Sequence, residues 1–76
     1  MQTIKIGDKV NWRGTWGKEV PKVVTVASIE WYEKADFTGG IPIPKEEILL
    51  PAKDWCTFSF VENDHWAYGH QIDLLN

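Results

Sequence analysis

The chain has 76 residues, a formal net charge of −3 and a single cysteine, Cys56. This length predicts one domain over residues 1–76, the single cysteine excludes an intramolecular disulfide, and the acidic balance argues against strong non-specific binding of nucleic acid. No stretch reaches the roughly 18–20 apolar residues of a membrane span, and residues 1–9 lack the apolar run of a secretory signal, so a cytoplasmic protein without a membrane partner is expected.

Aromatic side chains must supply much of the core of so small a domain. A chain of this length buries only about 60% of the surface that its unfolded form exposes. The sequence has five tryptophans, three phenylalanines and two tyrosines. Because each aromatic side chain buries roughly 150–250 Å², these residues replace the disulfides that other small domains use.

The first predicted strand covers residues 9–12 and follows a turn at residues 7–8. Polar and apolar residues alternate along it, which is the period of a half-buried strand. Val10 and Trp12 should therefore share its inner face. Residues 13–19 contain two glycines and are predicted to form a loop.

The longest predicted strand covers residues 20–32, which are rich in β-branched and aromatic side chains. Val24 and Val26 are in phase along it, but Ile29 is one position out of phase. A β-bulge near residues 27–28 would bring all three side chains into the core and bend the strand. A small five-stranded barrel requires such a bend.

Residues 35–40 form the second predicted loop, and prolines keep residues 41–44 extended. Residues 45–50 are compatible with a short helical turn or with a strand. Six residues between two prolines are too few for a stable helix, which favours a strand or an irregular edge.

The last third of the chain predicts a hairpin and a closing strand. Residues 55–60 alternate in polarity, and the inner face of this strand carries Cys56, Phe58 and Phe60. Residues 65–68 form the second arm of the hairpin. Residues 69–71 break the strand, and residues 72–74 resume it.

The order and spacing of these segments resemble an SH3-like barrel, the architecture shared by SH3, Tudor and KOW domains. Residues 7–12 (Gly-Asp-Lys-Val-Asn-Trp) are similar to the first strand of that group, and residues 24–30 to its bent second strand. Residues 65–74 resemble the strand, 3₁₀ turn and final strand that end SH3 domains. The resemblance implies an all-β fold, a single five-stranded SH3-like barrel with one short 3₁₀ turn before the last strand. It implies no particular activity, because this fold serves peptides, nucleic acids and assemblies alike.

The chain departs from each subgroup of that superfamily. It lacks the acidic loop and the Pro-Ser-Asn-Tyr run of peptide-binding SH3 domains, and residues 15–22 replace the KOW loop. The ending, residues 65–72 (His-Trp-Ala-Tyr-Gly-His-Gln-Ile), is also similar to small uncharacterised proteins of bacteria and their mobile elements.

A basic, aromatic loop is the first candidate site. Trp16 lies between two glycines, with Arg13, Lys18 and Lys22 nearby. Such a loop could stack a base and hold phosphate, as nucleic-acid-binding surfaces do. The alternative is that Trp16 folds back over the open end of the barrel, which the small size of the core favours.

An outward aromatic face is the second candidate site. With Ala67 inward, Trp66 and Tyr68 face outward, and Trp55 lies on the outer face of the preceding strand. By resemblance to SH3 domains, Tyr68 and Gln71 border a ligand groove. Clustered exposed aromatic side chains concentrate binding energy, although they could also pack under the first loop as a second small core. The predicted contact residues are Trp16, Trp55, Trp66, Tyr68 and Gln71.

A metal or catalytic site is the third candidate. Acidic side chains and histidines lie close together in the sequence: Glu62, Asp64, His65, His70 and Asp73. Neighbours on a strand point to opposite faces, however, and the two histidines match no strong zinc spacing. Cys56 falls on the core face, where its thiol should be inert. We therefore expect no enzyme activity, no metal and no cofactor.

A cage for methylated lysine, of the kind found in Tudor domains, needs three or four aromatic side chains around a cation. The residues with suitable chemistry are Trp12, Trp31, Tyr32 and Phe37. Since Trp12 and Trp31 are in phase with Val10 and Ile29, packing in the core and at its rim is the favoured interpretation.

Taken together, the sequence predicts a small non-catalytic module that binds a protein or peptide. One alternative is a nucleic-acid-associated module that uses the loop of residues 13–22. The other is a structural or self-assembling component that pairs through an exposed edge near residues 41–50.

Overall fold

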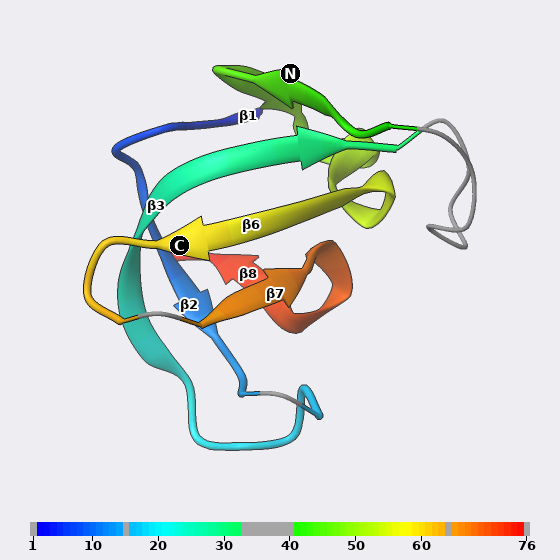
Figure 1. Cartoon of the computed structure of the whole chain (residues 1–76). Coiled ribbons are helices and arrows are strands. Elements are labelled where there is room, and N and C mark those ends of the chain that lie inside the picture. The colour runs from blue at the N-terminus through cyan, green and yellow to red at the C-terminus, as the bar shows by residue number, and fades with distance from the viewer. Residues whose placement is uncertain (1, 15, 33–40, 64, 76) are drawn as a thin grey trace.

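The computed structural model describes residues 2–14, 16–32, 41–63 and 65–75, which form an all-β arrangement of short strands (Figure 1). The strands are β1 (Thr3–Lys5), β2 (Lys9–Trp12), β3 (Lys22–Trp31), β4 (Ile43–Lys45), β5 (Glu47–Leu49), β6 (Cys56–Phe60), β7 (Trp66–Tyr68) and β8 (Ile72–Leu74). Two 3₁₀ turns, η1 (Leu50–Trp55) and η2 (Gly69–Gln71), complete the described elements. The all-β class predicted from the sequence is confirmed.

All described strand pairs are antiparallel, and the main sheet has the order β7-β6-β3-β2-β8. The five strands of this order match the five predicted strands. β4 adds to β3, and β1 pairs with β5 in a separate two-stranded sheet. Residues 45–50 are therefore mainly extended, as expected. Within the described residues no pairing joins β7 to β8, so closure into a five-stranded barrel is not shown by the pairing.

β3 is long and bent, and it pairs with a different strand along each half of its length. Its first half pairs with β2, and its second half pairs with β6 after a register shift between Val26 and Ser28 (Figure 1). This irregularity is the predicted bulge. It returns Ile29 to the inner face, so that Val24, Val26 and Ile29 are all buried.

The buried apolar side chains form one cluster drawn from both sheets. Its members are Ile4, Val10, Trp12, Val24, Val26, Ile29, Ile48, Cys56, Phe58, Phe60, Ala67 and Ile72. Trp12 and Phe60 lie with ring centroids 5.3 Å apart, and Trp31, Leu50 and Leu74 pack against the cluster from its rim. The inward positions predicted for Val10, Trp12, Cys56, Phe58, Phe60 and Ala67 are confirmed.

The two 3₁₀ turns pack against each other. Lys53 Nζ donates a 2.7 Å hydrogen bond to the carbonyl oxygen of Gly69. A Cβ atom at Gly69 would lie 1.7 Å from the carbonyl oxygen of Lys53, so a side chain cannot fit there without movement. η2 is the turn expected before the last strand, whereas η1 was not predicted.

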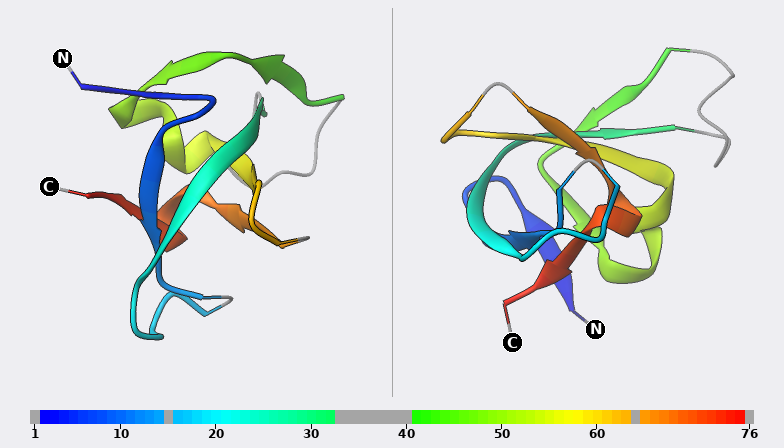
Figure 2. Two further views of the ribbon diagram at one scale, coloured as in Figure 1. Left: turned by 90° about the vertical axis from the view of Figure 1, so that its left-hand side faces the viewer. Right: turned by 90° about the horizontal axis from the view of Figure 1, so that it is seen from below.

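The segment between β2 and β3 projects from one end of the sheet, at the bottom of Figure 1 and of the left view in Figure 2. It is irregular over its described residues, in agreement with the predicted loop. The second predicted loop, residues 35–40, and Phe37 within it lie outside the described residues. No helix in the described ranges has the length and apolar character needed to cross a membrane.

Candidate functional site

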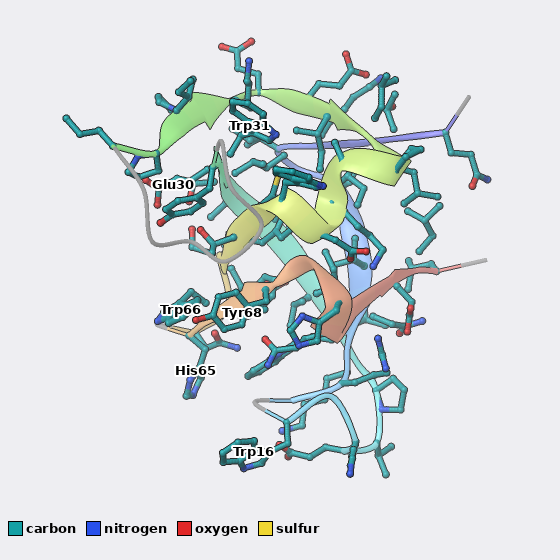
Figure 3. The ribbon with its side chains drawn as sticks, turned by 90° about the vertical axis from the view of Figure 1, so that its right-hand side faces the viewer. Trp16, Glu30, Trp31, His65, Trp66 and Tyr68 are labelled. Atoms are coloured by element: carbon teal, nitrogen blue, oxygen red, sulfur yellow. The ribbon has the colours of Figure 1, made fainter. Side chains whose placement is uncertain are left out.

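The outer face of β3, β6 and β7 carries a hollow of about 440 Å³. We call it the outer-face hollow, and its lining residues are Ser28, Glu30, Tyr32, Thr57, Phe58, Ser59, Trp66 and Tyr68. Figure 3 shows Trp66 and Tyr68 side by side with Glu30 above them, on the same side of the ribbon. The hollow therefore joins residues that lie far apart in the sequence.

Strand register places these side chains in two parallel rows. One row runs Ser28–Ser59–Trp66 across the three strands, and the other runs Glu30–Thr57–Tyr68. Between them lies the row Ile29–Phe58–Ala67, whose side chains are buried in the core. Because side chains alternate between the faces of a sheet, burial of the middle row turns both flanking rows outward.

Contacts along and between the rows make this face compact. The hydroxyls of Ser28 and Ser59 are hydrogen-bonded to each other. Trp66 and Tyr68 meet edge to face, with ring centroids 4.9 Å apart and an interplanar angle of 83°. Tyr68 also stacks on the ring of His70 at 5.7 Å. The aromatic wall is thus held by packing of its own rings.

Electrostatically, the hollow is acidic. Among the described residues of its lining, Glu30 is the one that carries a formal charge at neutral pH. The ion pairs seen among the described residues are Lys5–Glu47, Arg13–Asp73 and Lys53–Asp54. None of these pairs involves Glu30, so its carboxylate is not neutralised by a described cation.

The predicted aromatic face is confirmed in its orientation. Trp66 is 57% exposed, and Tyr68 is half-buried in the wall of the hollow. No described residue of the first loop lines the hollow, and Trp66 is exposed, so Trp66 and Tyr68 do not form a second small core beneath the described part of that loop. Trp55 is 39% exposed but ends η1 instead of starting β6, and it does not line the hollow.

Gln71 lies elsewhere than predicted. Its residue is only 6% exposed, and its Oε1 accepts a 2.9 Å hydrogen bond from the backbone N–H of Tyr68. The side chain therefore shapes the turn beside the hollow and does not offer a contact surface. Gln71 is therefore not a described lining residue of the hollow, in contrast to the contact position expected for it.

The basic loop differs from its prediction in two ways. Trp16 is 81% exposed and lies at the bottom of Figure 3, apart from the labelled residues of the hollow, so it does not fold back to cover an end of the sheet. Arg13 is held by structural contacts: Nε lies 2.8 Å from Asp73 Oδ2, Nη1 donates to the carbonyl of Gly17, and Nη2 donates to that of His70. Arg13 is thus engaged in fixing the loop, whereas the exposed Lys18 and Lys22 remain as its accessible cations.

The residues considered for a metal or catalytic site are dispersed. Glu62 accepts hydrogen bonds from both N and Oγ1 of Thr25, which hold the pKa of its carboxyl below the usual range. His65 lies against Trp12 at 5.3 Å, while Asp73 pairs with Arg13. Over the described residues no group of three or more His, Cys, Asp or Glu side chains could hold a metal ion, and Asp64 lies outside them.

Cys56 is fully buried in the core, and its Sγ donates to the carbonyl of Ala52 at 3.3 Å. Burial raises the pKa of its thiol to about 11, partly opposed by the positive charge of Lys45. The thiol is therefore protonated at neutral pH and a poor nucleophile.

The described members of the aromatic set considered for a Tudor-like cage are not gathered at one site, and Phe37 lies outside the described residues. Trp12 is in the core, and Trp31 packs at the rim of the core with Lys45 Nζ 5.9 Å from its ring centroid. Of the three described members, only Tyr32 lines the outer-face hollow. Glu30, which is not among the predicted contact residues, also lines the outer-face hollow. Its orientation could have been inferred from the bulge, since bringing Ile29 inward turns Ser28 and Glu30 outward.

No family model, no characterised protein and no solved structure matches this chain. The candidate site therefore rests on the geometry of the chain itself.

Proposed function

We propose that this protein is a small non-catalytic module with an SH3-like fold that binds a protein or peptide partner in the outer-face hollow. The observation that carries the proposal is the pair of outward rows, Ser28–Ser59–Trp66 and Glu30–Thr57–Tyr68. They place hydroxyls, one carboxylate and two aromatic rings on one hollowed face. Aromatic side chains dominate the binding energy of protein interfaces, and polar groups beside them fix orientation.

The SH3-like part of the proposal is supported by strand order. In the order β7-β6-β3-β2-β8 the bent strand β3 is central, and the last strand, β8, lies beside β2. A 3₁₀ turn, η2, links β7 to β8, as the resemblance implies. Among the strands of the described residues β7 pairs with β6 alone, so its other side is an edge along which an extended peptide can lie.

The test is selection of random dodecapeptides displayed on phage against the folded domain, followed by an amide and indole ¹⁵N–¹H correlation spectrum with the selected peptide. We expect the indole signal of Trp66 and the amides of Thr57 and Tyr68 to shift. Trp66→Ala should weaken binding by at least about tenfold, as removal of a central aromatic contact does. Trp16→Ala removes an equally large exposed ring elsewhere and should leave the affinity unchanged. Failure to select any peptide, or equal binding by Trp66→Ala, would overturn the proposal.

A second candidate function is association with single-stranded nucleic acid through the loop between β2 and β3. Its supporting observation is the exposure of Trp16, 81%, together with exposed lysines on the same segment, Lys18 in the loop and Lys22 at the start of β3. An exposed ring offers a stacking surface for a base, and neighbouring lysines can contact phosphate. The engagement of Arg13 with Asp73 removes one of the predicted phosphate contacts, which makes this the weaker candidate.

A further inference from the structure

We infer that the outer-face hollow takes a cationic side chain of the partner, and arginine more tightly than lysine, with its charge against Glu30 and its length against Tyr32, Trp66 and Tyr68. This inference rests on the proposed function and specifies the chemistry of its ligand.

Glu30 is held in a fixed position on the outer face of the sheet. It lies in β3 between two neighbouring strands, opposite Pro44 of β4 and Thr57 of β6. Backbone pairing on both sides therefore fixes where its carboxylate leaves the sheet. The residue is half-buried, unlike a carboxylate on an exposed rim. A partly desolvated carboxylate is stabilised when a cation approaches it, and no described ion pair supplies one.

Aromatic side chains form walls of the hollow near Glu30. Tyr32 follows Glu30 by two positions, and Tyr68 lies across Thr57 in the same row as Glu30. Trp66 and Tyr68 are in edge-to-face contact, at 83°, so the two rings present surfaces in different directions and a side chain in the hollow lies against the pair, not between its rings. The faces of aromatic rings attract cations because their π electrons make the face negative.

The choice of a cation follows from what other occupants would do. An anionic side chain would be repelled by Glu30, and an apolar one would cover the carboxylate without pairing it. The guanidinium group of arginine is planar, so it can stack on an aromatic ring while its N–H groups reach a carboxylate. Three hydroxyl side chains border the same hollow: Thr57, Ser28 and Ser59. Their oxygens can accept hydrogen bonds from the guanidinium N–H groups that are not bonded to Glu30. A lysine ammonium has the charge but cannot stack in this way, which favours arginine.

The test compares three five-residue peptides, acetyl-Gly-Gly-Xaa-Gly-Gly-amide, in which Xaa is arginine, lysine or citrulline, the neutral isostere of arginine. The readout is the indole signal of Trp66 and the amide signal of Tyr68 in ¹⁵N–¹H spectra, at peptide concentrations up to roughly 10 mM, where dissociation constants in the millimolar range are detected. We expect the arginine peptide to shift both signals, the lysine peptide to bind more weakly, and the citrulline peptide to leave them in place.

Glu30→Gln is the matched variant, because it removes the charge and keeps the shape. It should weaken binding of the arginine peptide about fivefold. Glu46→Gln removes the same charge from an exposed residue outside the hollow and should change the affinity less than twofold. Both variants should keep the dispersed spectrum of the folded domain, which separates loss of binding from loss of folding.

The outcomes distinguish this inference from the proposed function. Equal binding of arginine and citrulline peptides, or an unchanged affinity in Glu30→Gln, overturns the cationic ligand and leaves peptide binding intact. The inference of a cationic ligand also fails, and peptide binding stands, if phage-selected peptides bind in the hollow but the arginine peptide shifts neither Trp66 nor Tyr68. If neither the selected peptides nor the arginine peptide moves Trp66 or Tyr68, both the inference and the proposed function fail.

Discussion

Gln71 Oε1 accepts a hydrogen bond of 2.9 Å from the backbone N–H of Tyr68. The bond spans η2 from its last residue back to the residue before the turn. Gln71 also accepts, through its carbonyl oxygen, a 2.9 Å bond from the backbone N–H of Arg13. One buried residue therefore connects the aromatic wall of the outer-face hollow to the first loop, and this connection makes the turn a support for the site.

Gln71→Ala should lower the free energy of unfolding by about 1–2 kcal/mol, because it removes a buried side chain and the acceptor for Tyr68 N–H. Urea denaturation followed by tryptophan fluorescence measures this. Gln2→Ala, which truncates an exposed glutamine, is the control and should change stability by less than about 0.5 kcal/mol. A Gln71→Ala protein as stable as the control would show that this bond does not support the turn.

Gly69→Ala should be far more disruptive than its size suggests. The new Cβ would lie 1.7 Å from the carbonyl oxygen of Lys53, so η1 and η2 must separate, at about 3 kcal/mol or more. Gly17→Ala is the comparison: its φ of +73° is unfavourable for alanine, but the nearest atom lies 3.9 Å from the new Cβ. That variant should lose about 1 kcal/mol. Equal thermal denaturation midpoints of the two variants would contradict the tight packing of the turns.

Burial of the Cys56 thiol predicts a loss of stability in alkaline solution. Its pKa is about 11 in the folded protein and 9.0 in the reference state. Because the pKa is higher in the folded protein, the stability contributed by the protonated thiol is complete below pH 9 and is lost as the pH rises from 9 towards 11. Urea unfolding at pH 8, 9 and 10 measures it, with Cys56→Ala as the comparison because other groups titrate there too. The variant should lose stability less steeply with pH, and parallel curves would contradict the prediction.

Thr25 should control the ionisation of Glu62. The hydrogen bond from Thr25 Oγ1 is the largest cause of the lowered Glu62 pKa, followed by that from Thr25 N. Thr25→Val removes the first bond and keeps the second, so the pKa should rise towards its ordinary value without reaching it. Carboxyl ¹³C chemical shifts followed from pH 2 to 7 measure this.

The sign of the corresponding stability change is fixed by the direction of that shift. A lowered folded pKa contributes stability above the ordinary value of 4.5, and this contribution is lost as pH falls through the folded pKa. The acid limb of the stability curve should therefore be shallower in Thr25→Val. An unaltered Glu62 titration in the variant would show that the hydroxyl bond is not made in solution.

Nucleic-acid binding through the Trp16 loop is tested by its dependence on salt. If this second candidate holds, a mixed-sequence single-stranded oligonucleotide should shift the Trp16 indole signal at low salt, and the shift should recede as salt rises. Lys18→Gln and Lys22→Gln should each weaken that binding. Arg13→Gln should instead destabilise the fold, since Arg13 pairs with Asp73. An indole signal of Trp16 that does not move at low salt removes this candidate.

Local pattern was sufficient for most of the strands and for the inward face. The alternation of polar and apolar residues in 9–12 and 55–60 identified the buried positions, because every second side chain of a strand lies on the same face. These positions are Val10, Trp12, Cys56, Phe58 and Phe60. The bulge in β3 followed from the phase of Ile29 relative to Val24 and Val26. Trp66 and Tyr68 faced outward for the same reason, once Ala67 was assigned to the core.

The assembly of the site was decided by contacts between distant segments. Register across β3, β6 and β7 put Glu30 in one row with Tyr68, and no pattern within β3 alone fixes which residues of β6 lie opposite. Burial of Gln71 and the ion pair of Arg13 with Asp73 likewise depend on partners far along the chain. Alternation along a strand determines which side chains point outward, because it is a property of the backbone itself. Only the tertiary structure decides which of them meet, because cross-strand register is set by packing of the whole core.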